Sequence, residues 1–208
     1  RSWLPASCRG LEVHCMTLVM AYIGRQGAVM AGDMREIAFQ GDDPCIEALE
    51  RELYSGSIAS DNDLLERAGE IGVAIRVRDD KVKVTEQDGV LVGEVTETAG
   101  STIRQKRLYV TAGSYVIAEI IDSRLRVTQR GQAGNFVVLG NDITKQVAGQ
   151  CIREAWKGGT VPEAMRVILL TMQMASGVTA SVSRTFMLVH TDRAMNLAGA
   201  INRASGGE

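Results

Sequence analysis

Three residues near the start of the chain combine a nucleophile, an acid and a base at a fixed spacing. Thr17 begins an apolar stretch, and Asp33 and Arg35 stand where the next apolar stretch ends. A threonine with a free amine carries its own general base, because an α-amine with a pKa near ~8 can accept the hydroxyl proton. If the residues before Thr17 are removed, the spacing predicts an N-terminal nucleophile beside an acid and a base.

Each of these residues also has an ordinary structural explanation. An Asp-x-Arg pair at the end of a strand is most often a local ion pair or a turn device. Thr17 has no special chemistry while sixteen residues precede it. Only the joint spacing favours catalysis, and it requires two adjacent strands that bring the three residues to one place.

The sequence supplies two such strands. Apolar residues fill 18–23 and 28–32, and the glycine-bounded sequence 24–27 between them predicts a tight turn. Residues 1–16 show no period, and they are interpreted as a leader, an extension or a propeptide outside the fold. Met16, directly before Thr17, favours removal of an initiator methionine over cleavage of a propeptide.

Two short helices are expected within 43–72, which we treat as a helical insertion. Asp43 and Pro44 are typical of a helix start, and Ser60 is a typical N-cap for the second helix. Gly72 is typical of a helix end. Both helices carry charged residues on one face, so we expect them to lie on the surface.

A long β region follows the insertion. Alternating or continuous apolar segments predict strands at 73–77, 81–86, 89–95, 106–111, 114–121, 125–128 and 136–139. Residues 98–102 are expected to form a turn between two of them.

Two helices and one strand come after this β region. Asn141 caps the first helix, and Thr160 with Glu163 forms a capping box for the second, which runs to about residue 175. Apolar positions cover more than half of the second helix, which predicts a helix sandwiched between layers. His190 lies on the last strand, 185–190, and is expected in the core.

This order of elements predicts an α+β protein with at least two sheets, or one sheet covered on both sides. The chain has no regular strand–helix–strand alternation and no Gly-x-Gly-x-x-Gly motif, which argues against a dinucleotide-binding fold. Its 208 residues suit one ordinary domain.

Composition excludes several classes of partner. The net charge of −2 and an aromatic content of 4% argue against nucleic acid as the main partner. No apolar run is long enough to cross a bilayer, and the first sixteen residues lack the apolar core of a signal peptide. We therefore expect a cytoplasmic protein that is not inserted into a membrane.

The cysteines do not indicate a metal site or a disulfide framework. Cys8, His14 and Cys15 are crowded into a short segment with no second pair of ligands, which is a weak zinc signal. Ordinary reduced thiols are the better interpretation, and neither metal nor cofactor is expected.

The wording of several segments closely resembles a known family. Residues 27–35 match the opening of proteasome β subunits, in which Gly-Val-x-x-Ala-x-Asp-x-Arg follows a free threonine at the same offset. Within that superfamily the chain resembles the Connectase family of methanogenic archaea. The segments that carry this resemblance are Thr-Leu-Val-Met-Ala-Tyr-Ile-Gly, Met-Ala-Gly-Asp-Met-Arg-Glu-Ile, Glu-Leu-Tyr-Ser-Gly-Ser-Ile, Gly-Val-Leu-Val-Gly-Glu-Val and Thr-Ala-Ser-Val-Ser.

The resemblance covers roughly residues 16–191 and implies both a fold and an activity. The implied fold is a four-layer αββα sandwich of the N-terminal nucleophile, proteasome-like type, as a monomer and not as a proteasome ring. The implied activity is transpeptidation: cleavage at a sequence of the Lys-Asp-Pro-Gly-Ala type, an acyl-enzyme on the threonine, and transfer to another amine. The implied substrate is a subunit of the membrane-bound methyltransferase of methanogens.

The resemblance also assigns roles to individual residues. Thr17 corresponds to the nucleophile, Asp33 to the conserved acid and Arg35 to its basic neighbour. Gly113, in an Ala-Gly step, corresponds to the backbone N–H of the oxyanion hole. Its ordinary explanation is the relief of a tight bend.

Three further positions complete the implied site. A lysine that keeps the threonine hydroxyl acidic corresponds best to Lys83, with Lys81 second and Lys106 third, although an alternating strand of lysines is also typical of a solvated face. Asn141 stands where proteasome subunits carry a serine near the free amine. Ser183 or Ser181 corresponds to their second serine.

Two other functions remain open. A peptidase or amidase would use the same acyl-enzyme and differ only in whether water reaches the ester before an amine does. An inactive assembly or binding protein, like proteasome α subunits, would keep its N-terminal extension. We expect the catalytic domain at 17–192 and a C-terminal tail at 193–208.

Overall fold

The computed structural model describes residues 12–14, 18–99, 102–121 and 124–204. Within these ranges the strands form three antiparallel sheets. The central sheet has the order β11-β2-β3-β12, and its strands are β2 (Val19–Ile23), β3 (Ala28–Asp33), β11 (Asn135–Leu139) and β12 (Phe186–Thr191). The chain reverses between β2 and β3 at the predicted turn, where the N–H of Gly24 donates to the carbonyl of Gly27 at 2.8 Å.

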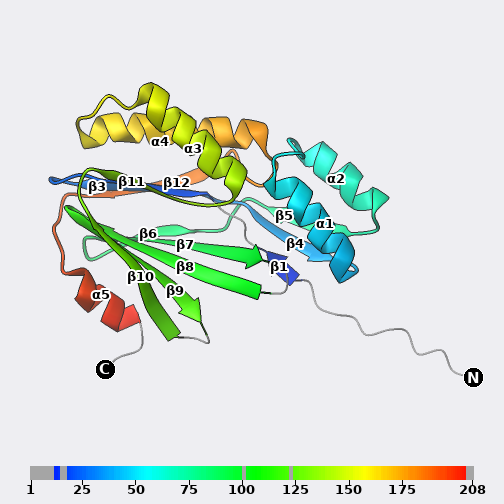
Figure 1. Cartoon of the computed structure of the whole chain (residues 1–208), viewed down its shortest axis with the longest axis horizontal. Helices are drawn as coiled ribbons and strands as arrows, with labels where there is room; N and C mark the ends of the chain where they lie inside the picture. Colours follow the sequence, from blue (N-terminus) through cyan, green and yellow to red (C-terminus); the bar gives the residue numbers. More distant parts are fainter. Residues whose placement is uncertain (1–11, 15–17, 100–101, 122–123, 205–208) are drawn as a thin grey trace, which may run out of the picture.

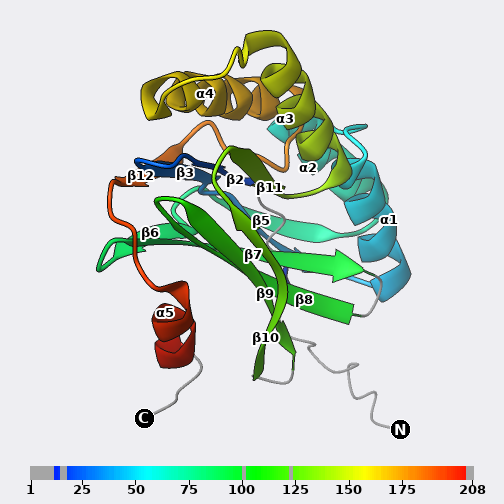
Figure 2. The ribbon, with the colours of Figure 1, turned by 60° about the vertical axis from the view of Figure 1, so that its left-hand side comes forward.

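Strands β2 and β3 are buried on both faces, because their alternate side chains enter two different cores. Leu18, Met20 and Tyr22 pack against helices α3 (Asp142–Ala155) and α4 (Val161–Val178). Val19 and Ala21 point the other way, toward a second sheet. Figures 1 and 2 show the two helices above the central sheet and the second sheet below it.

The second sheet has the order β10-β9-β8-β7-β6. Its strands are β6 (Val84–Gln87), β7 (Val90–Ala99), β8 (Thr102–Thr111), β9 (Ser114–Ile121) and β10 (Arg124–Gln132). The predicted turn at 98–102 is wrong in extent, because β7 continues to Ala99 and pairs there with Thr102.

A short helix lies on the far face of the second sheet. Helix α5 (Leu197–Ala204) packs Leu197 and Ile201 against Val90, Tyr109 and Val116. This helix lies within the segment expected as a C-terminal tail, 193–208, and the sequence did not predict it because its apolar residues are too few to give a clear period.

The third sheet has the order β1-β4-β5 and lies beside the helical insertion. It consists of β1 (Glu12–His14), β4 (Glu36–Gln40) and β5 (Ala74–Arg78), next to α1 (Asp43–Tyr54) and α2 (Asp61–Glu70). Phe39, Leu49 and Leu64 are fully buried in the core that these elements share. Because β1 pairs with β4, the interpretation of residues 1–16 as lying outside the fold is wrong for Glu12–His14.

Two predicted burials are also wrong. Helix α4 packs one face on the central sheet but exposes Leu169, Leu170 and Val178, so it is an outer helix and not a sandwiched one. His190 is exposed, since β12 is the edge strand of the central sheet. The predicted α+β class agrees with the mixed helices and strands observed.

No helix in the described part of the chain is long and apolar enough to cross a membrane.

Candidate functional site

The ends of the four strands of the central sheet lie together at one end of that sheet. Val19, at the start of β2, pairs with Leu139 at the end of β11 and with Gly32 near the end of β3. Phe186, at the start of β12, pairs with Asp33. The register therefore brings the segments around Leu18, Asp33, Asn141 and Ser183 together at this end of the sheet.

Asp33 is the centre of the hydrogen bonding at this end of the sheet, and it is completely buried. Its Oδ2 accepts a hydrogen bond from the N–H of Leu18 at 2.8 Å, and its Oδ1 accepts one from the N–H of Arg35 at 2.8 Å. The ammonium of Lys83 lies 3.2 Å from both carboxylate oxygens. Distances near 2.8 Å are typical of charge-assisted hydrogen bonds, so the carboxylate is held in one orientation.

Lys83 forms a buried ion pair with Asp33, and its side chain is 3% exposed. Removing two opposite charges from water is costly, and only close contact with further hydrogen bonds offsets that cost. A buried amine beside a carboxylate is a candidate functional group.

Strand β6 lies close enough to β3 for this pair because residue 32 is a glycine. A Cβ on Gly32 would lie 2.8 Å from Val84 Cγ1 and 3.5 Å from Lys83 Cβ. The sequence signal for this approach was Gly32 itself, one residue before Asp33 in a strand with no other glycine.

The other two candidate lysines are placed differently. Lys81 lies outside β6, and its ammonium is 3.6 Å from a carboxylate oxygen of Glu36. Lys106 lies in β8 of the second sheet. The structure thus brings the first of the three alternatives, Lys83, to Asp33.

Ser183 is also at this cluster. Its backbone N–H approaches Asp33 Oδ1 at 3.5 Å, and its Oγ accepts a hydrogen bond from the N–H of Met34 at 2.9 Å. The hydroxyl donates to the carbonyl of Thr185. Ser183 therefore fixes the turn of chain that leaves β3.

Asn141 is engaged in a neighbouring chain of buried polar groups. Its Oδ1 caps α3 by accepting from the N–H of Thr144 at 2.9 Å, as the sequence predicted. Its Nδ2 donates to Ser181 Oγ at 3.1 Å, and Ser181 contacts the Thr179 hydroxyl at 2.9 Å. These bonds hold the segment 179–183 against the start of α3.

Arg35 points away from Asp33 into a cluster of two other carboxylates. Its Nε and Nη2 donate to Asp79 at 2.8 and 2.9 Å, and its Nη1 and Nη2 donate to Asp61. A fifth bond reaches the carbonyl of Ala180 at 2.7 Å. Burial would lower the pKa of Arg35, but the hydrogen bonds and charges of Asp79 and Asp61 outweigh it and hold that pKa above its ordinary value.

The sequence did not identify Asp61 and Asp79 as partners of Arg35. Asp61 is in the first turn of α2, and Asp79 follows β5. An acidic residue at a helix start has an ordinary local explanation in the helix dipole, so nothing local pointed to Arg35.

Gly113 is not part of the cluster, which contradicts its predicted place in an oxyanion hole. It has a φ of +90° in the turn between β8 and β9, and its N–H donates to the carbonyl of Gly24 at 2.9 Å. Gly24 and Leu18 are at opposite ends of β2, roughly 20 Å apart at about 3.3 Å per residue. The ordinary explanation for Gly113, a tight bend, is the correct one.

Thr17, the predicted nucleophile, lies outside the described residues. Among the residues that are described, no group of His, Cys, Asp or Glu side chains could hold a metal ion.

Comparisons with known proteins place the chain in a family. Three solved structures resemble it at 12–13% sequence identity: HslV from Trypanosoma brucei, Anbu (ancestral beta-subunit) from Yersinia bercovieri, and the Anbu complex from Pseudomonas aeruginosa. They cover 83, 84 and 83% of this chain and 98, 80 and 80% of their own chains, with TM-scores of 0.36, 0.37 and 0.36. No curated protein matches the chain.

A family model described as "Connectase MJ0548-like, N-terminal domain" matches residues 16–204. The match spans almost all of the chain, including Asp33, Lys83 and Ser183, and it confirms the resemblance read from the sequence. The chain belongs to the Connectase family.

Proposed function

We propose that the chain is an N-terminal-threonine transpeptidase. In this proposal Thr17 cleaves a polypeptide at a sequence of the Lys-Asp-Pro-Gly-Ala type, keeps the acyl half as an ester, and passes it to another amine. The fold would be the proteasome-like αββα sandwich of N-terminal nucleophile enzymes. The protein would act as a cytoplasmic monomer, and its natural substrate would be a subunit of the methanogens' methyltransferase.

One observation carries the proposal. The N–H of Leu18, which belongs to the peptide bond that joins Thr17 to the chain, donates to Asp33 Oδ2. The same carboxylate holds the buried ammonium of Lys83 at 3.2 Å. The backbone nitrogen of Leu18, which follows Thr17 in the chain, is thereby fixed beside a buried acid–base pair.

The charges at this position suit an activated threonine. A cation near the hydroxyl stabilises the oxyanion that forms when the proton leaves, and this effect is strong where water is excluded. Asp33 balances the charge of Lys83 and fixes the direction of its ammonium. The free amine of Thr17, once exposed, would serve as the general base.

The reaction then follows in two balanced steps. The Thr17 oxygen attacks the carbonyl carbon of the peptide bond while the Thr17 amine accepts the hydroxyl proton. The bond to the leaving amine breaks, that amine takes the proton, and an ester to Thr17 remains. A second amine attacks the ester, forms a new peptide bond and returns its proton to the Thr17 oxygen.

The test is a ligation experiment with a form of the protein that begins at Thr17. It would be incubated with a peptide that contains Lys-Asp-Pro-Gly-Ala and with a second peptide that has a free N-terminal amine. We expect a joined product, separable by mass, in excess over the hydrolysed peptide. The Thr17→Ala variant should give neither product.

The alternatives give different results. Hydrolysis without joining, at any concentration of the second amine, would make the protein a peptidase or amidase. No turnover of this peptide, together with retention of residues 1–16 in the native protein, would favour the binding protein without a nucleophile.

A further inference from the structure

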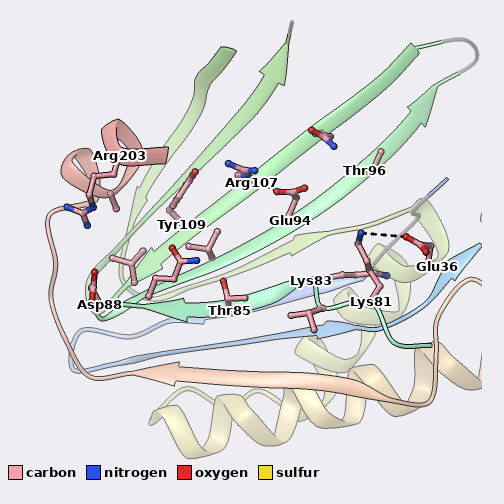
Figure 3. A pocket seen from close by; sticks show the side chains of 16 residues that line it. Glu36, Lys81, Lys83, Thr85, Asp88, Glu94, Thr96, Arg107, Tyr109 and Arg203 are labelled. Atoms are coloured by element: carbon pink, nitrogen blue, oxygen red, sulfur yellow. Dashed lines mark hydrogen bonds and ion pairs between the residues drawn. The ribbon is translucent and has the colours of Figure 1, made fainter. Parts of the chain in front are cut away.

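A long groove lies on the outer face of the second sheet. Its volume is about 950 Å³, and it runs between α5 and the segment that leads into β6. The strand residues that line it alternate with those buried against the central sheet, and in the middle they are Val92, Glu94, Thr96, Gln105, Arg107 and Tyr109. Figure 3 shows four of them, Glu94, Thr96, Arg107 and Tyr109, on one face of β7 and β8.

One end of the groove reaches a single residue of the candidate site, Lys83. The lining ends at Lys81, Val82 and Lys83, and Lys83 is the residue whose ammonium contacts Asp33. At the other end are Asp88 and Arg203 (Figure 3). The lining residues of β7 extend from Val90 to Thr96, which is roughly 20 Å at about 3.3 Å per residue. That length matches an extended peptide of about six residues.

The charges along the groove are mixed. Glu36 and Lys81 pair at the Lys83 end, and Arg107 donates to Glu94 at 2.6 Å in the middle. Asp88 and Arg203 add one charge of each sign at the far end. A surface with both signs along its length does not suit a polyanion, since nucleic acids require a stripe of positive charge. It suits a polypeptide that carries acidic and basic side chains.

Tyr109 supplies an independent sign of a polar ligand. Its hydroxyl is buried and makes no hydrogen bond within the described residues, although its residue lines the groove. Burial would lower the pKa of Arg107, but the hydrogen bond and the charge of Glu94 hold it above its ordinary value. A buried hydroxyl without a hydrogen bond is costly, and a ligand in the groove would offset that cost.

We propose that this groove binds an extended segment of the polypeptide substrate, about six residues long with side chains of both charges, next to the bond that is cleaved. The proposal rests on the proposed function for the identity of the cleaved bond, but binding itself needs no catalysis. Arg107, Glu94 and Tyr109 are then residues that determine affinity for the flanking sequence.

The test measures binding without turnover. The full chain with Thr17→Ala would be titrated into two fluorescein-labelled peptides, each with Lys-Asp-Pro-Gly-Ala at its centre. One peptide has flanks of alternating glutamate and lysine, and the other has flanks of serine and glycine. We expect the charged flanks to bind about fivefold more tightly, the size expected for a few partly exposed ion pairs.

Substitutions then locate the effect. The double change Glu94→Gln with Arg107→Gln should remove the fivefold advantage, and Tyr109→Phe should weaken binding of both peptides. Arg126→Gln is the matched control, because Arg126 is an exposed arginine on β10 outside the groove. Protection of residues 91–96 and 105–109 from amide hydrogen exchange by the charged peptide would place it on β7 and β8.

The outcomes separate this inference from the proposed function. Three results would overturn the proposal that the groove binds the substrate: equal affinity for both peptides, no binding of either peptide, or the same loss of affinity in Arg126→Gln. Binding in the groove by a protein that shows no acyl transfer would support the groove and contradict the transpeptidase.

Discussion

At the scale of residues, the buried pair of Asp33 and Lys83 is the feature that most needs a functional explanation. Both side chains are buried, and the carboxylate is further held by the N–H groups of Leu18 and Arg35. An apolar pair of similar volume would commonly be as stable or more stable. The pair is explained if its charges act on the residue next to Leu18.

The first prediction concerns Lys83. Replacing it with methionine should lower the rate of acyl-enzyme formation at least about 100-fold, because in the proposed mechanism the Lys83 ammonium stabilises the threonine oxyanion. Lys106→Met, at the lysine placed in β8, is the control and should react at close to the normal rate. The rate is followed by mass spectrometry of the protein after rapid mixing with peptide.

A loss of folding would give the same result, so a second variant is needed. Lys83→Met leaves Asp33 charged, buried and unpaired, which costs roughly 3–5 kcal/mol. Adding Asp33→Asn should restore much of the melting temperature without restoring acylation. Recovery of acylation in this double variant would show that the pair serves stability only.

At the scale of elements, Arg35 connects the helical insertion to the candidate site through ion pairs and hydrogen bonds. Its backbone N–H contacts Asp33, while its guanidinium contacts Asp61 at the start of α2 and Asp79 after β5. Arg35 is nearly buried at 6% side-chain exposure, whereas Asp61 and Asp79 are 57% and 37% exposed. Arg35, which the sequence predicted to be a basic neighbour of Asp33, therefore directs its side chain to the helical insertion and to the loop before Lys81, where it forms ion pairs.

The second prediction tests whether the ion pairs of Arg35 with Asp61 and Asp79 stabilise the fold. Asp79→Asn should destabilise the protein by about 1–2 kcal/mol, and Asp61→Asn by less, because water screens the more exposed partner. For a chain of this length, about 1 kcal/mol corresponds to roughly 2–4 °C in melting temperature. Glu66→Gln, at an exposed residue of α2, is the control. Melting temperatures of both aspartate variants equal to that of the control would contradict the account.

At the scale of the whole molecule, the sequence predicted what is local and missed what depends on packing. The strands at 18–23 and 28–32 and the cap at Asn141 were predictable, because alternation and capping are written in neighbouring residues. The exposure of Leu170 was not, because an apolar helix face does not say whether one layer or two will cover it.

The candidate site follows the same rule. The nearness of Lys83 to Asp33 depends on two sheets approaching at Gly32, and sequence left three lysines open. The prediction that Gly113 belongs to the oxyanion hole was wrong because an Ala-Gly pair in the sequence carries no information about which end of β2 it will contact. Asp61 and Asp79 meet Arg35 across 26 and 44 residues, beyond any local pattern.

The proposed transpeptidase activity requires that Thr17 is the residue that forms the ester. The most direct measurement is the intact mass, followed by fragmentation, of a form beginning at Thr17 after brief reaction with a Lys-Asp-Pro-Gly-Ala peptide. We expect an added mass equal to the acyl half of the peptide, located on residue 17 and absent from Thr17→Ala. An acyl group on any other residue, or one that persists in Thr17→Ala, would contradict the proposed activity.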